Sequence, residues 1–143
     1  MTTTNPNEVL LVEDNETDIT LAQEAFAECG IADRVRVVRD GAAALDQLLG
    51  PGASGPLPRL VLLDLRLPKV EGLEVLRRLR ADARTLAVPV VVMSTSIETG
   101  DVAAAYELHC NAFVQKAMSL DAFISAIRTI KEFFLDLNVT PSR

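Results

Sequence analysis

The sequence predicts an α/β protein in which a doubly wound, five-stranded parallel sheet is covered by helices on both faces. Short apolar runs alternate with amphipathic segments along the 143 residues, and this alternation is typical of parallel sheets with crossover helices. The runs are continuous stretches of leucine and β-branched residues, which indicates strands that are buried on both sides. The length suits one domain with a sizeable core.

The first apolar run, EVLLV at 8–12, predicts a buried strand. Asn15 then offers a helix N-cap, and Gly30 offers a C-terminal stop for the same helix. Between them, four apolar residues recur at helical spacing: Ile19, Ala22, Phe26 and Cys29. The run at 35–38 predicts the second strand, and a short helix is predicted over 41–49.

A Gly- and Pro-rich stretch at 50–58 follows, and its length suits a loop better than a linker between domains. The third strand is predicted at 60–63, where the sequence reads LVLL. A helix is predicted over 72–80 because three leucines share one of its faces: Leu73, Leu76 and Leu79.

The last third of the chain adds a fourth strand at 88–93, whose Pro89 stands near the start, where a missing N–H matters least. A helix at 99–108, a brief strand at 111–115 and a long helix at 119–137 complete the predicted elements.

We expect residues 8–137 to form the domain, between a flexible N-terminus at 1–7 and a tail at 138–143. The tail is too short for a DNA-binding or catalytic output domain, so the sequence predicts a domain that acts alone.

Composition and charge argue against several classes of protein. The net charge of −6 is unsuited to a nucleic-acid-binding surface. No apolar run approaches the roughly 20 residues that span a bilayer, and the start of the chain lacks the features of a signal peptide, so we expect a cytoplasmic protein. Cys29 and Cys110 form no CxxC motif and are expected to be reduced. His109 is the only histidine, which disfavours histidine-based metal sites and a Ser–His–Asp triad.

Polar side chains stand at the carboxyl ends of four predicted strands, the edge where function sits in doubly wound sheets. In chain order they are Glu13, Asp14, Asp64, Ser94, Thr95 and Lys116. Each of them has an ordinary explanation when taken singly: a carboxylate at a helix start, a turn residue, an N-cap or a solvated lysine. Coincidence is a poor explanation for the whole set, because four separate strands deliver it to one edge.

Carboxylates that lie close together repel one another unless protons or a cation join them. Oxygen ligands without His or Cys suit a hard ion, and Mg²⁺ accepts a few carboxylates together with retained water. A carboxylate beside Mg²⁺ can attack phosphorus and become an acyl phosphate. On this interpretation Asp64 is the nucleophile, Glu13 and Asp14 hold the metal, and Ser94 and Lys116 contact the phosphoryl group. Thr95 is a further candidate for that contact.

With these residues the chain resembles the receiver domain of two-component response regulators. Four stretches carry the resemblance: VLLVEDN at 9–15, VLLDLRLPKVEG at 61–72, PVVVMSTS at 89–96 and NAFVQKAM at 111–118. They hold an acidic pair, a D-x-x-x-P-x-x-x-G stretch, a hydroxyl and a lysine in the family's order and spacing. The resemblance covers nearly the whole chain and implies a flavodoxin-like sheet with the strand order 2-1-3-4-5.

The resemblance implies that Asp64 accepts a phosphoryl group from a histidine kinase or from a phosphotransfer protein. It implies that Mg²⁺ is held by Asp14 and Asp64, by Glu13 through water, and by the backbone carbonyl of Arg66. The protein would then be a signalling phosphoprotein that catalyses its own phosphoryl transfer, and not a conventional enzyme.

The resemblance also implies a switch, in which Ser94 moves toward the phosphate and the aromatic residue Phe113 turns inward. Receivers often have Tyr at the position of Phe113, so a switch here would work by packing alone. The loop at 50–58 and the extended final helix are similar to single-domain regulators that are paired with phytochrome-type histidine kinases.

Two further positions depart from the family pattern. Ala117 follows Lys116 where receivers usually have a proline joined by a cis peptide. A non-proline cis bond costs roughly 3 kcal/mol, so the bond is expected to be trans, and the placement of Lys116 stays open. Arg66 stands where relatives often have Asn or a small residue. Its guanidinium could approach the phosphate or cover the pocket, or it could lie in solvent as an ordinary turn residue.

The final helix predicts a contact with a second copy of the chain. At about 100° per residue, one stripe should face the core: Leu120, Ile124, Ile127 and Phe134. Three further residues widen the apolar arc beyond what one sheet face needs: Ile130, Phe133 and Leu137. We therefore expect a homodimer through this helix. The alternative is that the tail folds back on its own domain.

Three other functions compete with a phospho-accepting switch. A haloacid-dehalogenase-type phosphatase also uses an Asp nucleophile and Mg²⁺, but it needs an acid where this chain has Arg66. A receiver-like docking module that works without phosphorylation stays open because of Ala117. A flavodoxin-like cofactor binder would need a Gly-rich phosphate loop after the first strand, and the sequence has none there.

Overall fold

The computed structural model describes residues 8–51, 53, 55–95 and 97–141, and it confirms the predicted fold class. The strands are β1 (Val9–Val12), β2 (Val35–Val38), β3 (Leu60–Leu63), β4 (Val90–Ser94) and β5 (Ala112–Gln115). All neighbouring strands run parallel, and they form one sheet in the order β2-β1-β3-β4-β5. The predicted N-terminal segment at 1–7 and the end of the tail lie outside the described residues.

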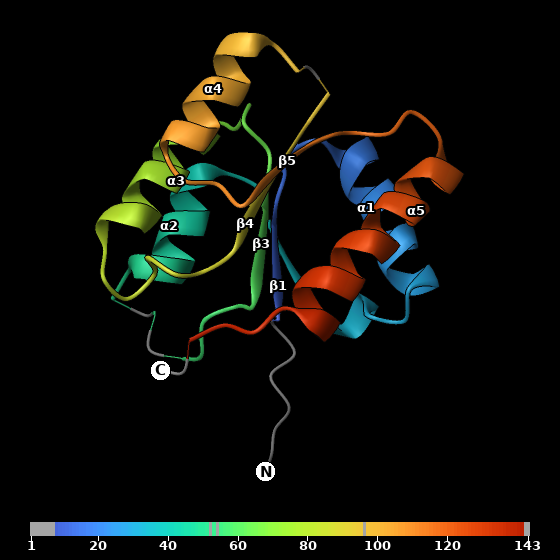
Figure 1. The fold of residues 1–143 in the computed structure, drawn as a ribbon, viewed down its shortest axis with the longest axis horizontal. Helices are drawn as coiled ribbons and strands as arrows, with labels where there is room; N and C mark the ends of the chain where they lie inside the picture. The colour runs from blue at the N-terminus through green and yellow to red at the C-terminus, as the bar shows by residue number, and fades with distance from the viewer. Residues whose placement is uncertain (1–7, 52, 54, 96, 142–143) are drawn as a thin grey trace.

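Helices cover both faces of this sheet. They are α1 (Glu16–Glu28), α2 (Gly41–Leu49), α3 (Gly72–Ala81), α4 (Thr99–Glu107) and α5 (Leu120–Lys131), with a 3-10 turn at Ala32–Arg34 and a π-helical segment at Glu132–Leu137. Figure 1 shows α1 and α5 side by side on one face, and α2, α3 and α4 on the other. None of the described helices has the length and hydropathy needed to span a bilayer.

Successive residues of the central strand β3 pack into two different cores. Val61 and Leu63 join the cluster formed with α2, α3 and α4, whereas Leu60 and Leu62 join the cluster formed with α1 and α5. None of these four side chains is more than 1% exposed. Burial on both faces is the reason that the central strands read as continuous apolar runs.

The predicted orientation of the final helix is wrong in part. Ile127 and Phe134 are buried as expected, but Ile130, which was expected on the outer flank, is only 8% exposed. It packs in the same core as Phe123, a residue outside the predicted stripe. The buried arc is turned in this way because α5 packs against α1 as well as against the sheet.

The single helix predicted over 119–137 also changes its winding near the end. The α-helical part ends at Lys131 and continues as a π-helix over Glu132–Leu137, which shifts the phase of the side chains. Phe134 is buried there, while Phe133 stays 48% exposed and Leu137 stays 71% exposed. The two phenylalanine rings meet edge to face, with their centroids 4.9 Å apart.

Candidate functional site

The carboxyl ends of β1 and β3 bring the two central carboxylates together. These strands pair in parallel with Val12 opposite Leu63, so the residues that follow, Glu13 and Asp64, leave the sheet side by side. The N–H of Asp64 donates to the carbonyl of Val12 at 3.1 Å. Asp64 is therefore held directly at the end of a central strand.

The ends of β4 and β5 supply the hydroxyls and the lysine at the same edge. Ser94 is the last residue of β4 and lies opposite Gln115 of β5, so Lys116 begins the loop that follows. The N–H of Lys116 donates to the carbonyl of Ser94 at 2.7 Å. The Ser94 side chain is buried, and that of Thr95 is exposed.

Three carboxylates gather where these strands end. Glu13, Asp14 and Asp64 each offer a ligand oxygen, and the three oxygens lie within 4.8 Å of one another. Glu13 and Asp64 are 3% and 7% exposed, whereas Asp14 faces solvent. The cluster therefore has a buried side, formed by Glu13 and Asp64, and a solvent-exposed side, formed by Asp14.

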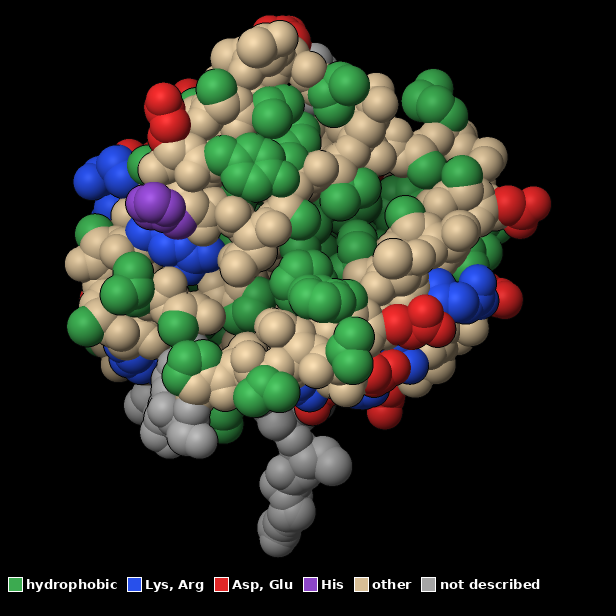
Figure 2. All heavy atoms as spheres, viewed as in Figure 1, with side chains coloured by type: hydrophobic (Ala, Val, Ile, Leu, Met, Phe, Trp, Pro, Cys, Tyr) green, Lys and Arg blue, Asp and Glu red, His purple; other side chains and the backbone are tan. Residues whose placement is uncertain are grey.

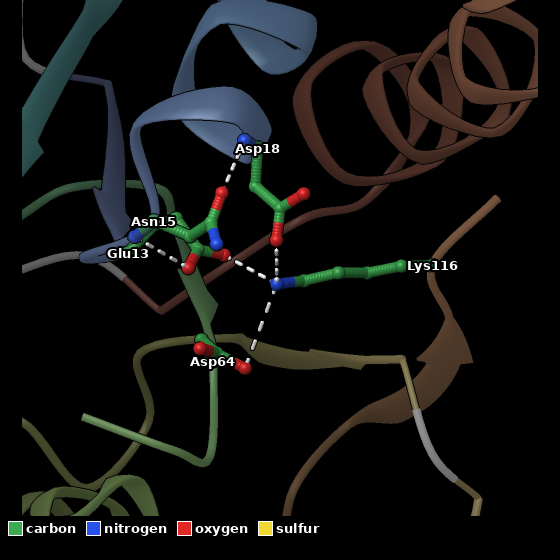
Figure 3. A network of polar contacts seen from close by, with 5 residues as sticks. All are labelled: Glu13, Asn15, Asp18, Asp64 and Lys116. Carbon is green, nitrogen blue, oxygen red and sulfur yellow. Dashed lines mark hydrogen bonds and ion pairs between the residues drawn. The ribbon is translucent and has the colours of Figure 1, made fainter. Parts of the chain in front are cut away.

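Lys116 reaches into this cluster from β5 and lies among three acidic groups (Figure 3). Its Nζ is 2.6 Å from Oε1 of Glu13, 2.8 Å from Oδ2 of Asp18 and 3.6 Å from Oδ1 of Asp64. The described chain contains no cis peptide, so the bond to Ala117 is trans, as predicted. The lysine reaches the site without a proline after it.

Burial shifts the proton affinities of the two inner carboxylates. It raises the pKa of Glu13 from 4.5 to about 7, although the hydrogen bond from Lys116 opposes this, and the charge of Asp64 adds to the increase. Burial likewise raises the pKa of Asp64, against the opposing charge of Lys116. Both pKa values are raised mainly by burial, which disfavours the charged form of a carboxyl group, and Lys116 offsets this only in part.

The lysine itself is held in its charged form. Burial alone would lower the pKa of Lys116, but its hydrogen bonds to Asp18 and Glu13 outweigh burial, and the pKa is raised. The site thus keeps one permanent positive charge within ion-pair distance of Asp64.

Arg66 is paired with an acidic residue outside the acid cluster. Its guanidinium pairs with Asp101 of α4, with Nη2 and Oδ2 2.6 Å apart. The side chain remains 58% exposed, which agrees with a solvated turn residue, and its predicted approach to a phosphate stays a prediction. The pair links the loop after Asp64 to α4.

Phe113 lies half-buried on β5 and packs against the core on the α4 side of the sheet. Together with Ile97, Val102 and Tyr106 it lines an open groove of about 450 Å³. The aromatic residue is therefore placed between the core and a surface beside α4.

Asp18 is the member of the site that sequence reasoning missed. It lies in the first turn of α1, four residues after Asp14, and makes one of the two short contacts to Lys116. The sequence signal was weak, because acidic residues are common in the first turn of any helix.

The profile of the response regulator receiver domain matches residues 9–128. FilR2, a probable methanogenesis regulatory protein of Methanothrix harundinacea, is 44% identical over 138 residues, which are 96% of this chain and 89% of that protein. Response regulator Rcp1 of Synechocystis is 37% identical over 139 residues, which are 96% of this chain and 95% of Rcp1.

Solved structures agree with these sequence matches. The phosphorylated cyanobacterial phytochrome response regulator RcpA superimposes with a TM-score of 0.85 at 40% identity, over 94% of this chain and 97% of that chain. The Mn²⁺-bound form of Rcp1 also gives a TM-score of 0.85, at 37% identity, over 96% of this chain and all (100%) of that one.

Proposed function

Because the chain belongs to the response regulator receiver domain family, we propose that it accepts a phosphoryl group on Asp64 and signals through protein–protein contact. The supporting observation is the convergence of Glu13, Asp14 and Asp64 with Lys116 at one edge of the sheet. The relative RcpA was solved in a phosphorylated form.

The acidic cluster fits a hard divalent cation. Three carboxylate oxygens lie within 4.8 Å of one another, and oxygen ligands of this kind suit a hard cation. Burial raises the pKa of Glu13, the charge of Asp64 adds to the increase, and a cation would offset that repulsion. We assign Mg²⁺ to Asp14 and Asp64, to Glu13 through water, and to the backbone carbonyl of Arg66. When bound, the ion would neutralise charge on the phosphoryl oxygens.

Asp64 acts as the nucleophile in this proposal. A carboxylate oxygen forms a bond to phosphorus while the bond from phosphorus to the donor's imidazole nitrogen breaks, and the electron pair stays on that nitrogen. Lys116, 3.6 Å from Asp64, supplies positive charge beside the transferred group. The hydroxyls of Ser94 and Thr95, at the end of β4, donate to its oxygens.

Phosphorylation would be communicated to α4. The phosphoryl group adds negative charge two residues from Arg66 and competes with Asp101 for its guanidinium. Ser94 would move toward the phosphate, and Phe113 would turn inward from the groove beside α4. Figure 2 shows hydrophobic side chains gathered over the region between α4 and α5, where a target protein could dock.

The phosphodonor belongs to the class that receivers use, a histidine kinase or a phosphotransfer protein. RcpA is a phytochrome response regulator, which favours a phytochrome-type kinase for this chain. The competing function is a receiver-like docking module that works without phosphorylation, and the presence of Ala117 is the observation in its favour.

Incubation of the protein with Mg²⁺ and acetyl phosphate should add the mass of one phosphoryl group to the intact chain. Asp64→Asn should gain none, because the nucleophile is lost, while the exposed control Asp33→Asn should gain as much as the wild type. The measurement is intact-mass spectrometry. A wild type that gains nothing would favour the docking module, and a gain that survives Asp64→Asn would move the phospho-acceptor elsewhere.

We further propose a homodimer formed through the end of the final helix. Phe133 and Leu137 remain exposed there, at 48% and 71%. Ile130, first assigned to this surface, is buried in the protein's own core and is left out of the proposal. Exposed large apolar side chains that lie close together favour a self-complementary contact.

Sedimentation should detect a dimer at tens of micromolar, and Phe133→Asp should convert it to a monomer, because a carboxylate would be desolvated in the contact. Leu86→Asp is the matched control, since Leu86 is 54% exposed but lies between α3 and β4; this variant should stay dimeric. A monomeric wild type, or a Phe133→Asp dimer of unchanged strength, contradicts the proposal.

A further inference from the structure

Asp18 contacts the buried lysine from a helix that supplies no other group to the proposed reaction. Its Oδ2 lies 2.8 Å from Nζ of Lys116, although the two residues are 98 positions apart in the chain. Figure 3 shows its carboxylate pointing from the first turn of α1 toward the ammonium group.

The way that α1 begins explains why this carboxylate is available. Asn15 is the N-cap, and its side chain accepts the N–H of Asp18 at 3.0 Å. In a capping box, the acidic side chain three residues after the cap would bond back to the N–H of the cap residue. Here Glu13 takes that role, since its Oε2 accepts the N–H of Asn15 at 3.2 Å. Asp18 is therefore left free to bind Lys116.

The three acidic groups around Lys116 do not all accept a hydrogen bond from its ammonium group. An ammonium group has three N–H donors. Glu13 and Asp18 take two of them at hydrogen-bond distance, whereas Asp64 lies at 3.6 Å, within ion-pair range but beyond a hydrogen bond. A lysine side chain loses considerable rotamer freedom when it is fixed in one place. Two charge-assisted bonds supply that restraint.

We propose that Asp18 is a positioning residue for Lys116. Together with Glu13 it holds the ammonium group beside Asp64 at a distance that leaves the third donor directed at the space a phosphoryl oxygen would enter. The charge that stabilises phosphoryl transfer is then in place before the group arrives. The catalytic part of this inference rests on the proposed function, whereas the restraint on Lys116 does not.

The restraint is tested first in metal-free protein without a phosphodonor. The chain has three lysines, Lys69, Lys116 and Lys131, so acetylation of each one by acetic anhydride is followed by peptide mass spectrometry. In the wild type Lys116 should react slowly, with the other two as internal references. Asp18→Asn should accelerate its labelling at least about threefold, because a charge-assisted bond is lost.

Glu16→Gln is the matched control. It removes one negative charge from the same turn of α1, but Glu16 pairs with Arg39 at the surface and does not contact Lys116. It should leave the labelling of Lys116 unchanged. Labelling in Asp18→Asn that equals that of the wild type overturns the inference, whatever the outcome for phosphorylation.

The second measurement is the rate of phosphoryl uptake from acetyl phosphate at several Mg²⁺ concentrations. Asp18→Asn should lower the maximal rate about tenfold, while its half-saturating Mg²⁺ concentration should change no more than in Glu16→Gln. General damage to the acidic cluster would instead weaken Mg²⁺ binding. A maximal rate equal to or above that of the wild type overturns the inference and leaves the proposed function intact. A wild type that takes up no phosphoryl group overturns the proposed function, and the labelling result still decides the restraint.

Discussion

Gly72→Ala should destabilise the protein by roughly 3 kcal/mol. Gly72 begins α3, and its N–H donates to the carbonyl of Leu65 at 3.0 Å, which closes the loop that follows Asp64. A Cβ at this position would lie 2.3 Å from the carbonyl oxygen of Asp64 and 2.7 Å from Cα of Leu65. Both are backbone atoms, so they cannot move aside as the end of a side chain could.

Urea denaturation followed by circular dichroism measures this effect. Gly100→Ala is the matched control, because a Cβ on Gly100 in the first turn of α4 meets no atom within 4 Å. It should be neutral or stabilise the protein by up to about 1 kcal/mol, since alanine favours helix more than glycine does. If Gly72→Ala is as stable as the wild type, the close approach of α3 to the Asp64 loop is wrong.

Metal-free protein should lose roughly 2–3 kcal/mol of stability as the pH rises from about 5 to 8. The folded-state pKa of Glu13, about 7, lies above its ordinary value of 4.5, and that of Asp64 is also raised. The folded protein therefore binds more protons than the unfolded chain in this window. The stabilisation that comes from the raised pKa of Glu13 is fully present below the pKa of this residue in the unfolded chain. It is lost as the pH rises through the pKa of the residue in the folded protein.

Denaturation in urea at pH 5 and pH 8, in the presence of a chelator, gives this difference. Asp64→Asn should flatten the pH dependence and be more stable than the wild type at pH 8, because one of the repelling buried charges is gone. Mg²⁺ at pH 8 should stabilise the wild type more than it stabilises Asp64→Asn. Glu16→Gln, at an exposed position, should follow the wild type. Equal stability of the metal-free wild type at both pH values would show that folding does not raise the pKa values of these carboxylates.

The sequence predicted the strands and the residues at their carboxyl ends because both depend on simple rules. Continuous apolar runs indicated a doubly buried parallel sheet, and parallel strands end at one edge whatever their separation in the chain. Glu13 and Lys116, which are 103 positions apart, could therefore be assigned to one site. The motif around Asp64 added its expected chemistry.

The partners of long polar side chains were not predictable in this way. Arg66 follows a strand end, as Asp64 does, but its guanidinium pairs with Asp101. Asp18 is an acid in the first turn of α1, a common place for one, and it binds Lys116. The direction of such a side chain depends on which helix lies across the loop, and this is decided only when the helices pack on the sheet.

For the final helix, too, local periodicity predicted some features, and tertiary packing decided the others. A period of about 100° per residue determines which side chains of α5 are neighbours around its axis, but it leaves open which direction the helix faces. Packing against α1 as well as the sheet buried Phe123 and Ile130, and the π-helical turn after Lys131 left Phe133 at the surface. The sequence by itself determined the elements and the edge that carries the site, because these follow from local periodicity and parallel topology. Only the tertiary structure decided the rotation of α5 and the contacts of Arg66 and Asp18, because these depend on packing between elements distant in the chain.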